Sequence, residues 1–468
     1  MSPFFVTHSF SLNLMHLTLF KQYDFLNRFI RLSLANIISN LMIPLAGSIS
    51  LVFLGHLSEV HDLAGPSFAV VLFDFIYYGF YFLRQSTTGV IAQAIGREDQ
   101  REVLLIGLRN ILIALVLGIL LLILQYPLRE IGFSMLSDTP EVKASAVAYF
   151  NARIIGAPAV FANYVLIGWL LGREESGKVL LISVIGNIVN ILLDYLLIIH
   201  WDWGATGAGL SMAISQYLML LVGLIFFCLQ IQWQELQDIT AKLLDWSALK
   251  SAFALNGNIF VSTLILISTT DIFSLESNTM GTIIFTQNTL ILQIIFLALY
   301  VVEGLGLATE SLVGYFTGQG AKEQLASLVR LSGQASLFLG LAFALVPALF
   351  PQRIFGLFTD HVEIISQIDT YIWWLPLFLT FSSVALALEG YFLGLAEGRT
   401  LRNINLTAIT LGFAPLSIVA WQFHNNHLLW LAYSMFMCIR MVMLGIQVPK
   451  TFESDFDTLQ AEATEILK

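Results

Sequence analysis

Three polar side chains on one predicted membrane segment carry the strongest chemical signal in this sequence. The stretch 183–199 is long enough to cross a bilayer, yet it contains Asn187, Asn190 and Asp194. Their i, i+3 and i+7 spacing places them on one face of a helix. An ionised Asp in the middle of a membrane helix costs about 2.5 to 3.5 kcal/mol, so it should face a protein interior or a water-filled cavity. The pattern favours an ion-linked site at Asp194, although amides alone also join membrane helices by hydrogen bonds.

Four further charged residues fall inside or beside apolar segments. Arg84 lies partway along the second segment, Glu303 and Glu310 share a helix face in and just after the eighth, and Glu389 lies in the tenth. A carboxylate removed from water is easier to keep in its neutral form, which suits a proton-linked step. We expect these four residues to line a substrate cavity. The alternative is that Arg84 pairs with the glutamates and holds two halves of the protein together.

The elements that position these residues are predicted membrane helices. The chain has 468 residues, of which 57% are hydrophobic and 12% are charged, far fewer charges than a soluble globule carries. Hydropathy predicts twelve segments, at 31–55, 67–93, 103–125, 143–171, 178–200, 205–230, 247–270, 281–305, 324–349, 363–394, 402–421 and 427–447. The sequence therefore predicts an all-α integral membrane protein. The first thirty residues lack the pattern of a cleaved signal peptide.

An internal repeat divides these segments into two groups of six. Residues 92–178 align without a gap with residues 314–400, at an offset of 222, and pairs such as Gly96 with Gly318 match. Six segments are an even number, so both halves enter the membrane in the same orientation. We expect an N-terminal segment (1–30), an N-lobe (31–230), a linker (231–245), a C-lobe (246–448) and an acidic tail (449–468). We call Asn187, Asn190 and Asp194 the polar stripe. The offset pairs Asp194 with Leu416 and Asn190 with Gly412, so the polar stripe belongs to the N-lobe alone.

The distribution of Lys and Arg predicts the orientation. With the N-terminus inside, fourteen of them fall in inner loops and ends, and only Arg129, Lys143 and Arg353 fall in outer loops. We therefore expect a multi-pass protein of the cell membrane with both termini in the cytoplasm. The formal charge of −10 comes in large part from short loops and the tail, which we expect to be solvated.

The chain resembles the multidrug and toxic compound extrusion family, and within it the DinF-like branch. The motifs that carry the resemblance are PLAGSISLVFLGHL (Pro44 to Leu57), FLRQSTTGVIAQAIG (Phe82 to Gly96), NILLDYLLI (Asn190 to Ile198) and EGLGLATESLVG (Glu303 to Gly314). The resemblance implies two six-helix lobes and the export of organic compounds, often cationic or amphipathic, in exchange for protons or sodium. It also implies that Asn190 and Asp194 belong to an ion site in the N-lobe, and that Arg84 is the branch's arginine of helix 2.

The sequence departs from the family pattern at positions that concern coupling. Ser50 stands where the first-helix motif usually has an Asp, and Glu303 and Glu389 stand where the branch tends to have Asp. A sodium site favours several hard oxygen ligands, whereas a proton site needs one titratable group. We therefore expect proton antiport rather than sodium antiport, with Asp194 as the principal group, Asn190 and Asn187 as its partners, and Ser50 at the same site.

Two other functions compete with this interpretation. A lipid-linked saccharide flippase of the same wider superfamily would need a strongly cationic cavity, and few Arg or Lys fall inside the predicted segments. A membrane-embedded enzyme would need converging His or metal-binding residues, and all eight His lie in terminal or loop segments. We expect no enzyme activity, no metal and no cofactor beyond the coupling ion. The expected partners are a small organic substrate and the lipid bilayer, with no nucleic acid, and we expect a monomer.

Overall fold

The computed structural model describes residues 25–55, 61–134, 140–231, 242–243, 245–358 and 368–466, and within these ranges the regular elements are all helical. The side chains of residues 453–466 are not described. Most of the expected N-terminal segment and linker lies outside the described residues, as do the acidic side chains of the expected tail. The domain boundaries at 30, 230, 245 and 448 therefore stay predictions.

The twelve predicted membrane segments correspond to twelve helical spans. Among the residues that the structure describes, eleven stretches are long and apolar enough to cross a membrane, and α2 (Leu26–Gly55) precedes them. In the N-lobe these stretches contain α3 (His61–Gly79), α4 (Phe82–Gly96), α5 (Gln100–Ile123), α7 (Pro140–Arg153), α8 (Ala157–Gly172), α9 (Ser176–Asp194) and α10 (Gly204–Leu229). In the C-lobe they contain α12 (Trp246–Thr279), α13 (Thr282–Gln319), α14 (Lys322–Leu349), α17 (Trp374–Gly394), α18 (Gly398–Ala408), α19 (Ala414–Phe423) and α20 (Asn426–Ile466).

Several spans depart from single uninterrupted α-helices. The second span breaks at residues 80–81, between α3 and α4, and the fourth contains a 3₁₀ turn, η1 (Ile154–Gly156). Two spans contain π-helical turns, η2 (Tyr195–His200) and η4 (Ile409–Phe413). The sequence placed the end of the eighth segment at residue 305, but α13 continues to Gln319. Glu310 therefore lies well inside a helix.

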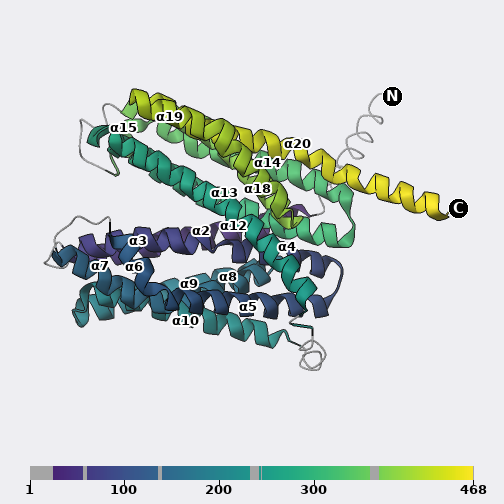
Figure 1. Ribbon diagram of the computed structural model, residues 1–468, viewed down its shortest axis with the longest axis horizontal. Coiled ribbons are helices and arrows are strands. Elements are labelled where there is room, and N and C mark those ends of the chain that lie inside the picture. The colour runs from purple at the N-terminus through teal and green to yellow at the C-terminus, as the bar shows by residue number, and fades with distance from the viewer. Residues whose placement is uncertain are drawn as a thin grey trace, which may run out of the picture.

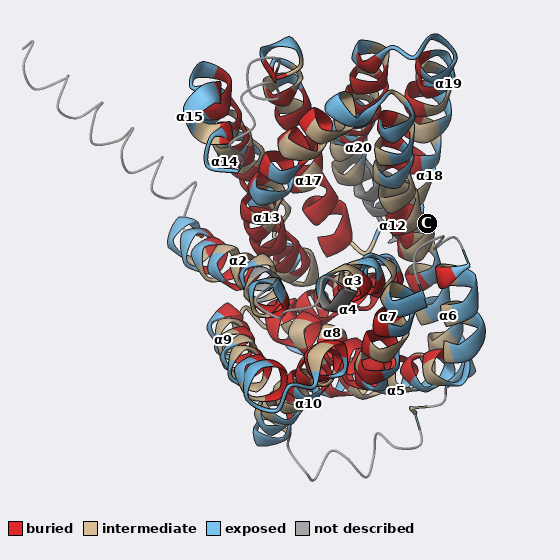
Figure 2. Ribbon diagram, turned by 90° about the vertical axis from the view of Figure 1, so that its left-hand side faces the viewer, coloured by how far each residue is buried: buried red, intermediate tan, exposed pale blue. Residues whose placement is uncertain are grey.

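Short helices cover one end of the bundle. These are α6 (Gln125–Phe133), α15 (Pro351–Phe355) and the 3₁₀ turn η3 (Ile368–Thr370). Figure 2 looks at this end and shows exposed loops and helix ends around two groups of helices whose facing sides are buried. Large apolar side chains such as Leu192, Leu221 and Leu411 are exposed on the outer faces of long helices, as expected where helices meet lipid.

Glycines lie where helices approach each other most closely. The same glycine contacts occur in both lobes, at positions 222 residues apart. A Cβ built on Gly168 in α8 would lie 2.6 Å from the carbonyl oxygen of Arg84 in α4. A Cβ built on Gly390 in α17 would lie 2.4 Å from the carbonyl oxygen of Gly306 in α13. Residues 168 and 84 correspond to 390 and 306 in the repeat. Both lobes therefore use the same close packing of two helices, which confirms the two-lobe repeat.

The lobes contact each other through α4 and α13, and the contact follows the same symmetry. A Cβ on Gly96 would lie 2.1 Å from the Tyr315 carbonyl oxygen, and one on Gly318 would lie 2.1 Å from the Gln93 carbonyl oxygen. Gly96 and Gly318 are partners in the repeat, and so are Gln93 and Tyr315. The lobes meet near the end of the bundle where α4 and α13 contact each other. They diverge toward the opposite end, which carries α6 and α15 (Figure 1). We refer to the Gly96–Gly318 contact as the glycine crossing.

Candidate functional site

Asp194 lies fully buried where three N-lobe helices meet. It is the last residue of α9, its side chain is 0% exposed, and its two carboxylate oxygens each accept a hydrogen bond from a serine hydroxyl. Ser50 of α2 donates to Oδ2 and Ser211 of α10 donates to Oδ1. Neutral donors satisfy the carboxylate on both sides, and no Lys or Arg forms an ion pair with it within the described ranges. We call Asp194, Ser50, Ser211 and Asn190 the N-lobe polar cluster.

The two amides of the polar stripe have different surroundings. Asn190 Nδ2 donates to the Ser211 hydroxyl at 3.2 Å, and Asn190 Oδ1 is buried without a hydrogen-bond partner. Asn187 instead donates to the Ser183 carbonyl oxygen of its own helix at 2.8 Å. The structure therefore brings Ser50 into contact with Asp194 and Asn190 into contact with Ser211, and it leaves Asn187 outside these contacts. Its expected role as a partner of Asp194 stays a prediction.

The backbone changes directly after Asp194. The π-helical turn η2 begins at Tyr195, whereas the α-helix ends at Asp194. A π-helical turn leaves the α-helical pattern of backbone bonds and often occurs at functional sites. The C-lobe has its π-helical turn at 409–413, which corresponds to 187–191 in the N-lobe, so the feature does not follow the repeat. The local backbone at Asp194 is particular to the N-lobe, as is its polar stripe.

Arg84 and Glu303 form an ion pair between the lobes. Arg84 Nη2 of α4 lies 3.0 Å from Glu303 Oε1 of α13, and the Arg84 guanidinium lies 3.9 Å above the centre of the Tyr81 ring. The Tyr81 hydroxyl donates to Glu303 Oε1 at 2.5 Å, and Asn40 of α2 donates to Oε2 at 3.4 Å. Arg84 is 5% exposed. The break between α3 and α4 places Tyr81 and Arg84 at the start of α4, where both reach the same carboxylate.

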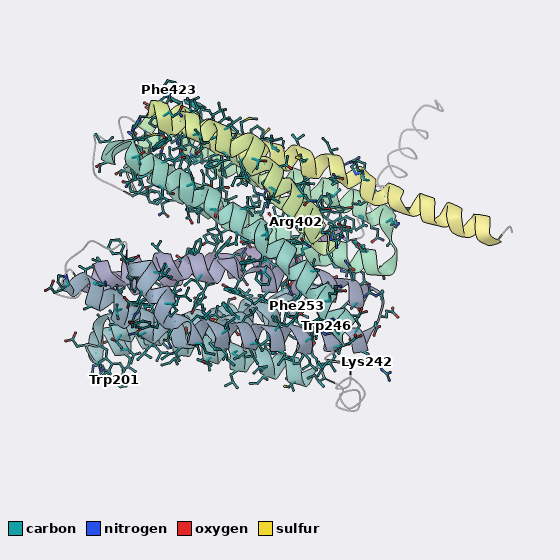
Figure 3. All side chains as sticks on the ribbon, viewed as in Figure 1. Trp201, Lys242, Trp246, Phe253, Arg402 and Phe423 are labelled. Atoms are coloured by element: carbon teal, nitrogen blue, oxygen red, sulfur yellow. The ribbon has the colours of Figure 1, made fainter. Side chains whose placement is uncertain are left out.

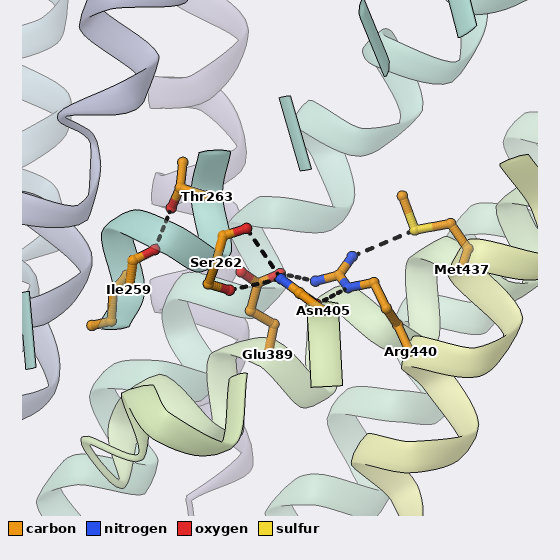
Figure 4. Close-up of polar contacts among 7 residues, drawn as sticks. All are labelled: Ile259, Ser262, Thr263, Glu389, Asn405, Met437 and Arg440. Atoms are coloured by element: carbon orange, nitrogen blue, oxygen red, sulfur yellow. Dashed lines mark hydrogen bonds and ion pairs between the residues drawn. The ribbon is translucent and has the colours of Figure 1, made fainter. Parts of the chain in front are cut away.

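Glu389 belongs to a separate network inside the C-lobe. Figure 4 shows Glu389 Oε2 of α17 beside Arg440 Nη2 of α20, at 2.8 Å. Arg440 Nε donates to Asn405 Oδ1 at 2.7 Å, and Asn405 Nδ2 donates to the Ser262 hydroxyl at 2.7 Å. The network ties four helices of one lobe together. Both charged partners are buried, so each supplies the counter-charge that the other needs.

Glu310 is the third carboxylate of this region, and it differs from the other two. It is 1% exposed, its Oε1 has no hydrogen-bond partner, and among the described residues it forms no ion pair. Its electrostatic neighbours include Arg84, Glu389 and Glu303. The three carboxylates Glu303, Glu310 and Glu389 therefore have two guanidinium groups, those of Arg84 and Arg440, as counter-charges. The region carries either one excess negative charge or one bound proton.

Helix α2 connects the N-lobe polar cluster to the pair between the lobes. Ser50 on α2 contacts Asp194, and Asn40 on the same helix contacts Glu303 and the Tyr300 carbonyl oxygen. Pro44 lies between these two positions inside the helix. Proline removes one backbone hydrogen bond and clashes with the preceding turn, so it favours a bend there. One helix therefore contacts both Asp194 and Glu303, with a proline between the two contacts.

Sequence reasoning missed Ser211, Arg440, Asn405 and Ser262. Ser211 carries no charge and lies on a different helix from Asp194, so no sequence signal marks it. Arg440 lies within the predicted segment 427–447, and the cost argument that identified Arg84 applies to it equally. Arg84, Arg109 and Arg440 are all buried within the spans. Within the described residues, no group of three His, Cys, Asp or Glu could hold a metal ion.

Comparison with known proteins gives the family. The MatE family model matches residues 35–196 and 257–419, two stretches that begin 222 residues apart and together cover more than half of the chain. The chain belongs to the MatE family. The two matched stretches also coincide with the internal repeat. The predicted family, the all-helical fold and the two-lobe architecture are thereby confirmed.

Several relatives of this MatE protein carry multidrug-resistance names. It is 28% identical over 417 residues to "DNA damage-inducible protein F" of Escherichia coli, covering 88% of this chain and 90% of the relative. It is 22% identical to "Probable multidrug resistance protein NorM" of Thermotoga maritima, covering 86% and 88%. The first match agrees with the DinF-like motifs.

Solved structures show the same fold at low identity. An outward-facing multidrug resistance MATE transporter matches with a TM-score of 0.83 and 19% identity, covering 91% of this chain and 96% of that chain. The Vibrio cholerae MATE transporter VcmN in its bent form matches with a TM-score of 0.80 and 18% identity, covering 92% and 98%. The chain is a multi-pass membrane protein of the multidrug efflux family, and its relatives are transporters rather than enzymes.

Proposed function

We propose that this protein exports organic cationic or amphipathic compounds in exchange for protons by alternating access. The observation that carries the proposal is the N-lobe polar cluster. Asp194 is fully buried, and both of its oxygens accept hydrogen bonds from serine hydroxyls, Ser50 and Ser211. Such a carboxylate can take up a proton in place. A sodium ion would need those hydroxyl hydrogens to turn away and further oxygens to converge.

Proton uptake would weaken the contacts that hold three helices at Asp194. Hydrogen bonds to an ionised acceptor are roughly twice as strong as those between neutral groups. When a proton from outside neutralises Asp194, α2, α9 and α10 repack against one another. The movement of α2 reaches Glu303 through Asn40, with Pro44 as the bend between them. Substrate then leaves toward the outside, and the proton is released inside.

The balance of charged residues around Glu310 favours a cationic substrate. Glu303, Glu310 and Glu389 share two arginines, Arg84 and Arg440, so one carboxylate remains for a positively charged group. An amphipathic cation would place its charge near Glu310 and its apolar part against the apolar helix faces. The Arg84–Glu303 pair then has two functions in this proposal, since it joins the lobes and borders the substrate. The flippase alternative gains support only if these buried arginines bind an anionic substrate.

Transport in reconstituted vesicles tests the coupling. We expect export driven by an imposed inward proton gradient, with no requirement for sodium, and we expect Asp194→Asn to abolish this gradient-driven export while substrate binding persists. Asp271→Asn is the matched control, because Asp271 also lies in a membrane span but is exposed and outside the cluster. Transport driven by sodium alone would overturn the proton assignment. Full activity in Asp194→Asn would overturn the site.

A further inference from the structure

A groove lies on the C-lobe between three of its membrane-spanning helices. It has a volume of about 350 Å³ and is lined by residues of α14, α17 and α20. The helix α17 contributes Val384 and Leu388, α20 contributes Gly445 and Val448, and α14 contributes the rest of the lining. That volume is within the range of small-ligand sites. The lining is apolar except for Arg330 and Gln334, which are one helical turn apart on α14.

The corresponding place in the N-lobe is filled. A Cβ on Gly107, the repeat partner of the lining residue Val329, would lie 3.0 Å from both Trp169 and Phe227, whose rings pack together. In the C-lobe, a Cβ on Gly333 or on Gly445 would meet nothing within 4 Å. The repeat partner of Gly333 is Ile111. The groove is therefore open beside Gly333, where the C-lobe lacks the side chain that Ile111 supplies in the N-lobe.

The arginines of the two lobes differ in the same way. Arg109 of α5 donates to the carbonyl oxygens of Leu243 and Lys242, at 3.2 Å and 3.0 Å, so the linker satisfies it. Arg330 occupies nearly the corresponding place on α14, and its repeat partner is Leu108. Arg330 is exposed, and among the described residues it makes no hydrogen bond or ion pair. It lies eight residues after Lys322, about 12 Å along the helix axis and inside the membrane span.

We propose that this groove binds an anionic phospholipid, with an acyl chain along the apolar floor and the phosphate on Arg330. An unpaired guanidinium in a membrane span is costly unless it reaches an anion, and the long arginine side chain can extend to the phosphate level. The groove lies toward the end of α14 that the Lys and Arg distribution places at the cytoplasm, where membranes carry anionic lipid. Gln334 supplies a second polar group. The acyl chain lies over Gly333, at the position where the N-lobe has Ile111.

A bound lipid would hold α20 against α17. Leu388 lines the groove, and the next residue, Glu389, pairs with Arg440 of α20. The lipid therefore contacts the two helices joined by that buried pair from their outer side.

Native mass spectrometry of the purified full-length protein tests the proposal. The protein is mixed with equal amounts of dioleoyl phosphatidylglycerol and dioleoyl phosphatidylcholine, and the retained lipid is counted. We expect wild type to retain the anionic lipid about fivefold better, as one Arg contact near a charged headgroup predicts. We expect Arg330→Gln to remove that preference. We expect Gly333→Ile, which restores the N-lobe side chain, to lower retention of both lipids.

Arg101→Gln is the matched control, since Arg101 is exposed near the start of α5 at the same end of the bundle. It should leave retention unchanged, and size-exclusion elution confirms that each variant is folded. Equal retention of both lipids by wild type would overturn the proposal, as would an equal loss in Arg101→Gln. Retention of tetraphenylphosphonium by wild type in place of either lipid, and its loss in Gly333→Ile, would also overturn the proposal, because the groove would then bind a cationic compound.

Discussion

Asp194 is held by groups that sequence reasoning could identify only in part. Its charge inside an apolar segment marked it, and the i, i+3, i+7 spacing marked Asn190 and Asn187. The structure places Ser50 and Asn190 in the cluster and adds Ser211, which belongs to another helix. A serine in a membrane helix has no cost that a sequence can reveal. Partners of this kind require the fold, because only the packing of α2, α9 and α10 brings the hydroxyls together.

The Arg84–Glu303 pair gives a prediction at the same scale. Glu303→Gln should leave the buried Arg84 without its counter-ion, at a cost of about 3 kcal/mol or more, and should strongly reduce both folded yield and export. Arg84→Gln should be milder, since Tyr81 and Asn40 still donate to Glu303. Thermal unfolding in detergent and export at equal expression measure both effects.

The surface pair Arg97–Glu102 provides the control for that experiment. Both side chains are about 40% exposed, and surface pairs contribute about 1 kcal/mol or less, so Arg97→Gln should change little. If Arg84→Gln and Glu303→Gln both leave stability, transport and substrate preference unchanged, the two residues are neither a structural pair nor part of the substrate path.

At the scale of helices, hydropathy located the spans but not their interruptions. The segment 67–93 was predicted as one helix, and the structure divides it after Gly79, which places Arg84 at the start of α4. A glycine inside the aromatic run YYGFYF is a weak signal for such a break. The end of α13 was placed too early, because the polar residues after 305 lower the hydropathy although they are buried among helices. Polarity read from sequence cannot distinguish a loop from a protein interior.

The glycine crossing predicts how α4 and α13 respond to a small side chain. Gly96→Ala would place a Cβ 2.1 Å from the Tyr315 carbonyl oxygen, so the lobes could not meet at that end. We expect the population to shift toward a state that is open at the crossing, seen as a longer distance between spin labels at Glu98 and Lys322. Gly177→Ala is the control, because nothing lies within 4 Å of a Cβ there. An unchanged label distance in Gly96→Ala would show that the helices yield locally instead.

For the whole molecule, the repeat and the parallel arrangement of the lobes followed from the 222-residue offset, and the MatE matches confirm them. The orientation in the membrane stays a prediction from Lys and Arg. Figure 3 places Trp201 and Phe423 at one end of the bundle and Lys242 at the other. The two ends thus bear the loops that the charge distribution assigns to opposite sides of the membrane.

Single-cysteine labelling in intact cells tests that orientation. An impermeant maleimide should label cysteines placed at Arg129, Asp202, Arg353 and Asn425, and should not label cysteines at Glu98 or Lys242 until the membrane is permeabilised. The reason is that Lys and Arg are in excess in the loops at the end that carries Glu98, and loops rich in these residues stay in the cytoplasm. Protection of all four outer positions, with labelling of the other two, would reverse the topology.

The glycine crossing also bears on how a two-lobe chain arises. Gly96 and Gly318 occupy the same position in the two repeats and lie against each other across a two-fold relation. In a symmetric pair of identical six-helix chains, this contact would be a residue touching its own copy. Any larger side chain introduced there would collide with itself, so both copies must stay small together. Once the halves are fused, each position can change alone, and a single substitution can make the two lobes unequal at the point where they meet.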